Sequence, residues 1–356
     1  MNLFLSDDKV ETAMNIFELT HNDLTRIMNK KYGKGAYHST ALYREILKKG
    51  NLFFETANEF LKSQNLAKTI KKDLTVSIPE ISNVVSKDNT LKYLCKHNDG
   101  LESESVIIEM KNHNTLCVSS QIGCKMGCSF CETGRIGFKR NLTVSEIVSQ
   151  IYTAKFILNT KIDNIVFMGM GEPFDNFKNV VKSIHVISDQ RGLDIAHRHI
   201  TVSTSGLTDG IQKFAKLDLK KVNLAISLNA PNDIIRSKLM PINRKHNMAE
   251  LQEVLRHYPL RKRGSFLIEY VLIRGVNDSK DHADEVAEFL SGLNVRFNLI
   301  PLNKTSSYAV EGTTDEEVHR FARYLEAKGL FVIKRWSRGD SLSAACGQLG
   351  SRNKHD

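Results

Sequence analysis

The chain has few of the features of secreted or membrane-spanning proteins. It contains six cysteines in 356 residues, too few for a disulfide scaffold. No apolar run approaches the roughly 18 residues that span a bilayer, and residues 1–8 lack the basic start and cleavage site of a signal peptide. Apolar residues make up 41% and charged residues 25%, which excludes wholesale disorder. We therefore expect a folded cytoplasmic protein of about two domains, without membrane contact.

The chain is basic overall, with 50 Lys and Arg against 40 Asp and Glu. The excess is concentrated in residues 125–140 and 320–356, and both stretches contain cysteine. In the second stretch, eight basic residues stand against three acidic ones. The charge alone leaves two interpretations open: a solvated face, or a basic rim around a reactive site whose substrate is a phosphodiester chain.

The type of local pattern changes along the chain. Residues 1–80 contain patterns of short helices, and residues 81–115 alternate in places as short strands do. From residue 115 onward, strands and helices take turns, with strands expected at 116–119, 164–168, 199–203, 222–227, 266–272 and 295–300. We predict a helical accessory domain (1–80), a short β extension (81–115), an α/β barrel domain (116–335) and a C-terminal segment (336–356).

Two of the expected helices have clear start signals. Thr143 with Glu146, and Thr314 with Glu317, each form the pattern of a capping box. Six alternating strand–helix units predict a parallel sheet that is short of the eight units of a closed barrel. We therefore expect an open, partial barrel whose ligands bind at the carboxyl ends of its strands.

The strongest chemical signal is a group of three closely spaced cysteines, Cys124, Cys128 and Cys131, in the loop after the first expected barrel strand. Three thiolates at this spacing suit three corners of a four-iron cluster and leave one iron without a protein ligand. A zinc site is the alternative, but it needs a fourth ligand and tetrahedral closure. We therefore favour an iron–sulfur cluster.

The cysteine group and several further motifs resemble one family. A cysteine triplet after the first strand of a partial barrel resembles the radical S-adenosylmethionine (SAM) superfamily. The surrounding motifs resemble, more narrowly, the RlmN/Cfr family of RNA adenine methyltransferases. These motifs are LCVSSQIGC (116–124), GFKRNLT (137–143), MGMGEP (168–173), STSG (203–206), APND (230–233), MPIN (240–243) and AACGQL (344–349). The resemblance implies a partial (β/α)6 radical-SAM barrel with a small helical N-terminal accessory domain that binds RNA.

The resemblance also implies a reaction and its catalytic residues. A [4Fe-4S] cluster on Cys124, Cys128 and Cys131 would use two SAM molecules per methyl group transferred, because an electron-poor adenine carbon does not attack the methyl of SAM directly. Cys346 would carry the methyl group as a thiolate nucleophile. Glu104 would accept a proton. Cys117 would then release the RNA by attacking the Cys346 sulfur, leaving a disulfide that must be reduced.

The SAM-binding residues implied by the resemblance fall at the carboxyl ends of the expected strands. They are Gly171, Glu172, Ser203, Ser227, Leu228, Asn229 and Asn303. The chain departs from the family pattern in several places: the prolines usual after Asn303 are absent, residues 340–343 replace a more acidic run, and two single residues differ. Asn229 stands where the family usually has histidine, and Glu132 follows the third cysteine, where a small residue is usual. Taken without the family, Cys117 fits a small buried hydrophobe, Glu104 a surface charge and the polar strand-end residues ordinary capping.

The expected substrate is 23S rRNA, methylated at adenine C2, with tRNA as a further substrate. Three alternatives remain: methylation at adenine C8, a radical-SAM reaction on another substrate, and an RNA-binding factor with a structural cluster. Residues 334–338, with the single tryptophan Trp336 among cations, suit either RNA contact or an edge strand with Trp336 in the core. We expect a monomer that is reduced by a donor of the flavodoxin or ferredoxin type.

Overall fold

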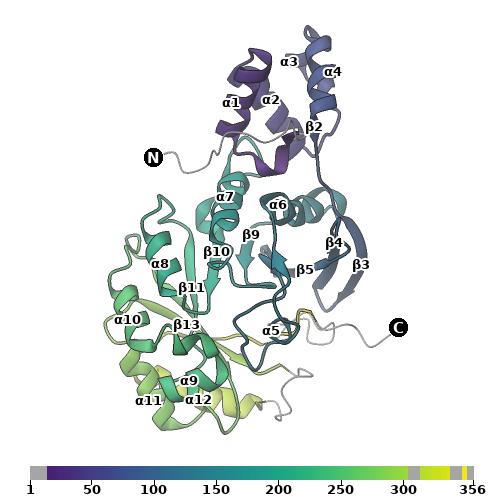
Figure 1. The fold of residues 1–356 in the computed structure, drawn as a ribbon. Helices are drawn as coiled ribbons and strands as arrows, with labels where there is room; N and C mark the ends of the chain where they lie inside the picture. Colours follow the sequence, from purple (N-terminus) through teal and green to yellow (C-terminus); the bar gives the residue numbers. More distant parts are fainter. Residues whose placement is uncertain (1–13, 304–312, 337–346, 351–356) are drawn as a thin grey trace.

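One continuous sheet of ten strands organises the chain from residue 80 to residue 334 (Figure 1). The computed structural model describes residues 14–303, 313–336 and 347–350. In spatial order the strands of this sheet are β14 (Val332–Lys334), β13 (Val295–Pro301), β12 (Phe266–Leu272), β11 (Asn223–Ser227), β10 (Ile200–Thr204), β9 (Asn164–Phe167), β6 (Asn114–Cys117), β5 (Glu102–Glu109), β4 (Thr90–Lys96) and β3 (Glu80–Lys87). Two small ribbons pair β1 (Met14–Asn15) with β2 (Leu74–Thr75), and β7 (Gln121–Ile122) with β8 (Arg140–Asn141).

The parallel part of the sheet is the predicted partial barrel. Strands β6 and β9 to β13 coincide with the six expected strands to within a few residues and pair in parallel. Strand β10 is buried along its whole length, as expected when helices cover a parallel sheet. Strand β14 adds a further parallel pairing at the edge, with Phe297 opposite Val332.

The helices of the barrel are α5 (Glu132–Arg135), α6 (Val144–Tyr152), α7 (Phe177–Ser188), α8 (Thr208–Ala215), α9 (Asp233–Leu239), α10 (Met248–Arg256), α11 (Lys280–Phe289) and α12 (Asp315–Ala327). Two of them, α6 and α12, begin where the capping patterns predicted. Thr143 and Glu146 form both hydrogen bonds of the capping box of α6, and Thr314 and Glu317 do the same for α12. Within the described ranges, no helix combines the length and the apolar run that crossing a bilayer requires.

The N-terminal helices pack directly on the barrel. They are α1 (His21–Tyr32), α2 (Ala36–Tyr43), α3 (Asn58–Leu61) and α4 (Gln64–Asp73), and Figure 1 shows them at one end of the molecule, beyond α6 and α7. Phe17 contacts Tyr152 of α6 with ring centroids 4.9 Å apart, and the Tyr152 hydroxyl donates to the Gly50 carbonyl at 3.3 Å. One hydrophobic core therefore runs from these helices into the barrel. The division of the chain into four parts stays a prediction.

The three strands before the barrel extend its sheet. Strands β3, β4 and β5 pair antiparallel, and β5 pairs antiparallel with β6. In this register Val106 of β5 lies opposite Cys117 of β6. Glu104 lies two residues earlier on β5, so the sheet brings the predicted proton acceptor and the predicted resolving cysteine close together.

Candidate active site

A cavity of about 180 Å³ lies at the carboxyl ends of the barrel strands, where the fold places ligands. This volume is several times that of a water molecule, so it suits a group of many atoms. The predicted residues that line it come from the cysteine loop and from the ends of successive strands: Cys124, Cys128, Cys131, Gly171, Glu172, Ser203, Ser227, Asn229 and Asn303. Leu228 is instead fully buried in the main hydrophobic core.

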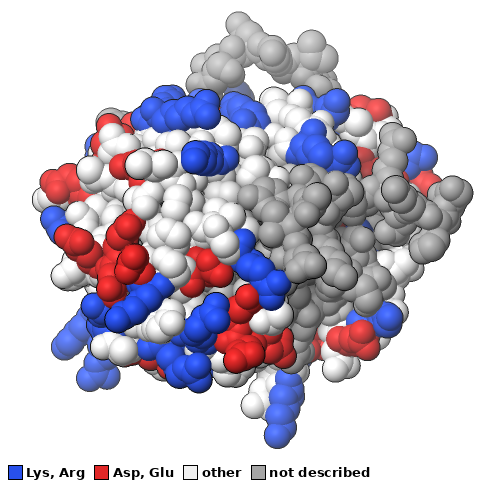
Figure 2. All heavy atoms as spheres, turned by 90° about the horizontal axis from the view of Figure 1, so that it is seen from below, with Lys and Arg blue, Asp and Glu red and all other residues white. Residues whose placement is uncertain are grey.

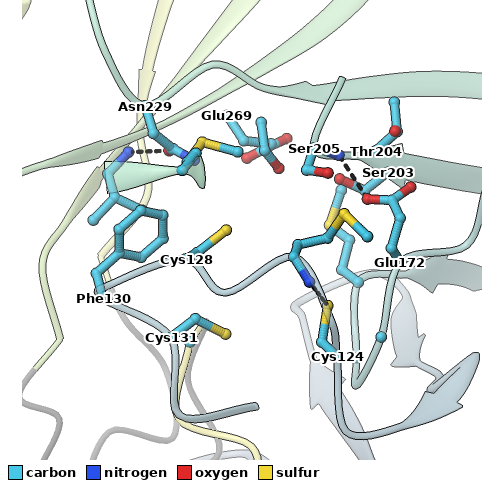
Figure 3. A pocket seen from close by; sticks show the side chains of 18 of the residues that line it. Cys124, Cys128, Phe130, Cys131, Glu172, Ser203, Thr204, Ser205, Asn229 and Glu269 are labelled. Atoms are coloured by element: carbon cyan, nitrogen blue, oxygen red, sulfur yellow. Dashed lines mark hydrogen bonds between the residues drawn. The ribbon is translucent and has the colours of Figure 1, made fainter. Parts of the chain in front are cut away.

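The three cysteine sulfurs surround one space. Figure 3 shows Cys128 and Cys131 on one side and Cys124 on the other, with their sulfurs directed inward. The Met126 N–H donates to Cys124 Sγ at 3.5 Å, and backbone N–H groups of Thr133 and Gly134 donate to Cys131. Hydrogen bonds of this kind stabilise thiolates that hold iron–sulfur clusters.

Burial keeps these thiols from ionising on their own. It raises the pKa of Cys124 to about 12, and it also raises the pKa of Cys128 and Cys131. Bound iron ionises such thiols, because its positive charge favours the thiolate. Among the residues that the structure describes, no three His, Cys, Asp or Glu side chains form a site for a single metal ion. The donor set and the surrounding cavity fit a cluster of several iron atoms.

The loop after β9 approaches the cavity through its backbone. Gly171 has a φ of 96°, and a Cβ at this position would overlap the side chain of Gln121. The Glu172 carboxylate accepts from the backbone N–H of Phe174 at 3.1 Å and of Ser205 at 2.8 Å. Oε1 therefore stabilises the turn of this loop, and Oε2 ties the loop to the residue that follows β10. The expected SAM contact of Glu172 stays a prediction.

Asn229, one of the two single residues that differ from the family pattern, joins the ends of two strands. It has a φ of 57°, a left-handed conformation that asparagine tolerates well. Its Oδ1 accepts from the Val271 N–H at 2.8 Å, and its Nδ2 contacts Met240 Sδ at 3.3 Å. The side chain that replaces the usual histidine therefore holds β11 against β12.

Sequence reasoning missed two buried charged residues at this end of the barrel, Arg236 and Glu269. The Arg236 guanidinium donates to the carbonyl oxygens of Ser205, Ser227 and Leu228 at 2.7, 3.2 and 3.1 Å. Burial lowers the pKa of Arg236 to about 10. No pattern in the sequence marks Arg236.

Glu269 belongs to the cavity wall. It accepts from Asn298 Nδ2 at 2.7 Å, and burial raises its pKa. Its position in the otherwise apolar strand β12, FLIEYVL, was the signal that could have revealed it.

Cys117 and Glu104 are not among the residues that line the cavity. Glu104 is only 6% exposed, and burial raises its pKa while the Lys92 ammonium, 2.9 Å from Glu104 Oε2, opposes that rise. Cys117 is partly buried and packs against a small cluster that contains Leu349.

Glu132, the second residue that differs from the family pattern, lies where Gly347 contacts the loop that carries Cys124, Cys128 and Cys131. Cys346 lies outside the described residues, but Gly347, to which it is bonded, lines the cavity. The backbone N–H of Glu132 donates to the Gly347 carbonyl at 2.7 Å. The Glu132 carboxylate pairs at 2.9 Å with Arg135 at the other end of α5. This ion pair accommodates a side chain that is larger than the one usual at this position.

Trp336 lies on the surface. It is 43% exposed and stacks on His319 with ring centroids 5.7 Å apart. Strand β14 is an edge strand, as one of the two interpretations of residues 334–338 predicted. The same interpretation placed Trp336 in the core, and this was wrong because the strand ends at Lys334, before Trp336. The RNA contact of residues 334–338 stays a prediction, and residues 337 and 338 lie outside the described part of the chain.

The partial barrel and its three-cysteine cavity define a radical SAM protein. Residues 118–290 match the Radical SAM superfamily. The crystal structure of a radical SAM methyltransferase from Sphaerobacter thermophilus superimposes with a TM-score of 0.87 at 35% identity, covering 95% of this chain and all of that one.

Comparison with curated relatives shows which family within the radical SAM superfamily the chain belongs to. The chain is 40% identical to the dual-specificity RNA methyltransferase RlmN of Geobacter sulfurreducens over 345 residues, which covers 96% of this chain and 93% of the relative. It is 42% identical to RlmN of Geotalea uraniireducens over 308 residues, covering 85% and 88%. The chain belongs to the RlmN family of dual-specificity RNA methyltransferases. Proteins of this family use a [4Fe-4S] cluster and SAM.

Proposed function

We propose that this protein methylates carbon 2 of an adenine in 23S rRNA, and of an adenine in tRNA, through a methylated cysteine. The observation that carries the proposal is that Gly347 lines the same cavity as Cys124, Cys128 and Cys131. The chain that carries Cys346 therefore reaches the three-cysteine centre. The RlmN relatives support the same reaction.

Three cysteines prepare the site. Cys124, Cys128 and Cys131 would hold a [4Fe-4S] cluster, which together with SAM would supply the radical that removes a hydrogen atom from a methyl group. Gly171, Ser203 and the other residues at the strand ends surround the SAM molecule.

The chain's own side chains then carry out the transfer. Cys346 holds the methyl group and presents it to the adenine. Glu104 accepts the proton that leaves the adenine carbon, a role that suits a buried carboxylate whose pKa is raised. The Cys117 thiol, opposite Val106 on the next strand, attacks the Cys346 sulfur: an S–S bond forms, the bond between that sulfur and the carbon on the RNA breaks, and this carbon takes up a proton, which balances the one lost by the thiol, to become the methyl group of the released RNA.

The same proposal covers the oligomeric state, the compartment, the electron donor and the RNA-binding surface. We propose that the protein acts as a monomer in the reducing cytoplasm. The electron donor is of the flavodoxin or ferredoxin type, because the reaction consumes electrons at the cluster and in reducing the disulfide. The RNA-binding surface includes the N-terminal helices and residues 334–338.

Mass spectrometry of nucleosides tests the proposal. Reconstituted protein, SAM and a reductant are incubated with 23S rRNA or tRNA, and the digested RNA is analysed for methylated adenosines. We expect 2-methyladenosine from both substrates. Formation of 8-methyladenosine would show the C8 reaction instead. SAM cleavage without RNA methylation would indicate another substrate, and reduced protein that never cleaves SAM would indicate an RNA-binding factor.

A further inference from the structure

The residues that follow Cys346 are anchored at three points. The Gly347 carbonyl accepts from the Glu132 N–H at 2.7 Å, and the Leu349 carbonyl accepts from Thr133 Oγ1 at 2.6 Å. These two anchors come from the residues directly after Cys131. The third anchor comes from β5, where Glu104 Oε1 accepts from the Gly350 N–H at 3.0 Å. The segment 347–350 thus bridges the cysteine loop and the strand of the proton acceptor.

Apolar packing places the same segment near Cys117. Leu349 is buried with Val106 and Met170, and the partly buried Cys117 packs against this cluster. The segment therefore contacts Glu104 directly through Gly350, and through Leu349 it contacts the apolar cluster on which Cys117 packs. The Glu104 anchor differs from the other two because its acceptor is a carboxylate, and hydrogen bonds to charged groups are stronger than those between neutral groups.

The Glu104 carboxylate is itself held from the neighbouring strand. Lys92 of β4 is 1% exposed, and its Nζ lies 2.9 Å from Glu104 Oε2. Oε2 faces the lysine while Oε1 faces Gly350, so one carboxylate links β4 to the C-terminal segment. A buried carboxylate that loses its cation either takes up a proton or turns toward water. Both outcomes weaken its bond to the Gly350 N–H.

We propose that Lys92 is a positioning residue that fixes Glu104 on Gly350, and thereby docks the residues next to Cys346 between the cysteine loop and Cys117. Docking by residues 347–350 follows from the contacts described above. Its importance for catalysis rests on the proposed function.

Hydrogen–deuterium exchange of the full-length protein tests the docking. In Lys92→Met we expect the backbone amide of Gly350 to exchange at least about tenfold faster, because its hydrogen bond to a charged acceptor is lost. The matched control is Lys96→Met, since Lys96 lies on the same strand and pairs with Glu80 at 3.7 Å, with both side chains exposed. The control should leave the exchange of the Gly350 amide unchanged.

A second variant keeps the test decisive if Lys92→Met does not fold. Glu104→Gln retains an oxygen acceptor but loses the ion pair, and it should also speed the exchange of the Gly350 amide. Unchanged exchange in the folded variants, or an equal change in Lys96→Met, would overturn the proposal.

Steady-state kinetics separate the docking from the proposed function. For Lys92→Met we expect a lower kcat with an unchanged KM for SAM, because Lys92 lies outside the cavity wall. If the wild-type protein methylates no adenine but Lys92→Met still loosens the segment, the proposed function fails and the docking stands. If the wild-type protein methylates RNA and the variants leave the exchange unchanged, the docking alone fails.

Discussion

Cysteine side chains in this protein differ in surroundings more than in chemistry. Cys95 on β4 is fully buried, and burial raises its pKa to about 12, as for a structural residue. Cys124, Cys128 and Cys131 are partly buried and share one cavity. Cys117 is partly buried beside Leu349. Location in the fold therefore separates the structural cysteine from those proposed to act.

Removing the Cys117 thiol tests its role in releasing RNA. In Cys117→Ala we expect RNA to stay covalently joined to Cys346, because no second thiol attacks the sulfur that carries the adduct. A denaturing gel with labelled RNA measures the adduct. Cys95→Ala is the matched control and should release RNA normally. Normal turnover in Cys117→Ala would remove Cys117 from the mechanism.

Glu269 predicts a pH dependence of stability. Burial raises its pKa in the folded protein above the ordinary carboxyl value, so the folded state keeps the proton longer than the unfolded state as the pH rises. This residue therefore lowers stability progressively above the ordinary carboxyl pKa. In Glu269→Gln we expect the gain in Tm over the wild type to grow as the pH rises above the ordinary carboxyl pKa. Melting curves that shift in parallel over this range would contradict the assignment.

The elements of the barrel are connected at their carboxyl ends by buried polar side chains. Glu172 ties the loop after β9 to the end of β10, and Asn229 ties β11 to β12. Arg236 of α9 connects β10 and β11 through three carbonyl oxygens. Such connections hold the cavity wall in one geometry, because each side chain bonds two elements at once.

Arg236 is the connection whose loss should cost most. In Arg236→Met we expect the free energy of unfolding to fall by about 3 kcal/mol, since several buried carbonyl oxygens lose a charged donor. SAM binding should weaken as well, because Ser227 lines the cavity. Chemical denaturation and equilibrium binding measure the two effects. Arg244→Met, at an exposed position nearby, should change stability by less than about 0.5 kcal/mol. Equal effects in the two variants would contradict this account.

At the scale of the whole molecule, one core joins the N-terminal helices to the barrel, and charge is distributed unevenly. Figure 2 shows Lys and Arg interspersed with Asp and Glu on one face, with a row of basic side chains along its upper edge. The overall excess of 50 basic over 40 acidic residues suits a polyanionic substrate.

RNA affinity should therefore fall with salt. Each phosphate neutralised by Lys or Arg releases counterions, so the logarithm of the binding constant should decrease linearly with the logarithm of the salt concentration. Filter binding or fluorescence anisotropy over a range of salt concentrations measures the slope. A flat response would argue against binding through a basic rim.

Local spacing was enough to predict the six barrel strands, the starts of α6 and α12 and the three-cysteine loop. Each of these depends on residues close together in the chain: alternation for a strand, a capping box for a helix, and three thiols within eight residues for a cluster. The proposed roles of Cys117, Glu104 and Cys346 came from the family resemblance, because no local pattern indicates them.

Tertiary structure alone decided which distant groups meet. Lys92 and Glu104 meet because β4 and β5 pair in one register. Gly350 joins them because its N–H donates to Glu104 on β5. The role of Arg236 became clear only from the fold, in which the ends of β10 and β11 direct three carbonyl oxygens at one guanidinium. A buried charge is stable only where the fold supplies partners for it, and those partners lie far away in the sequence.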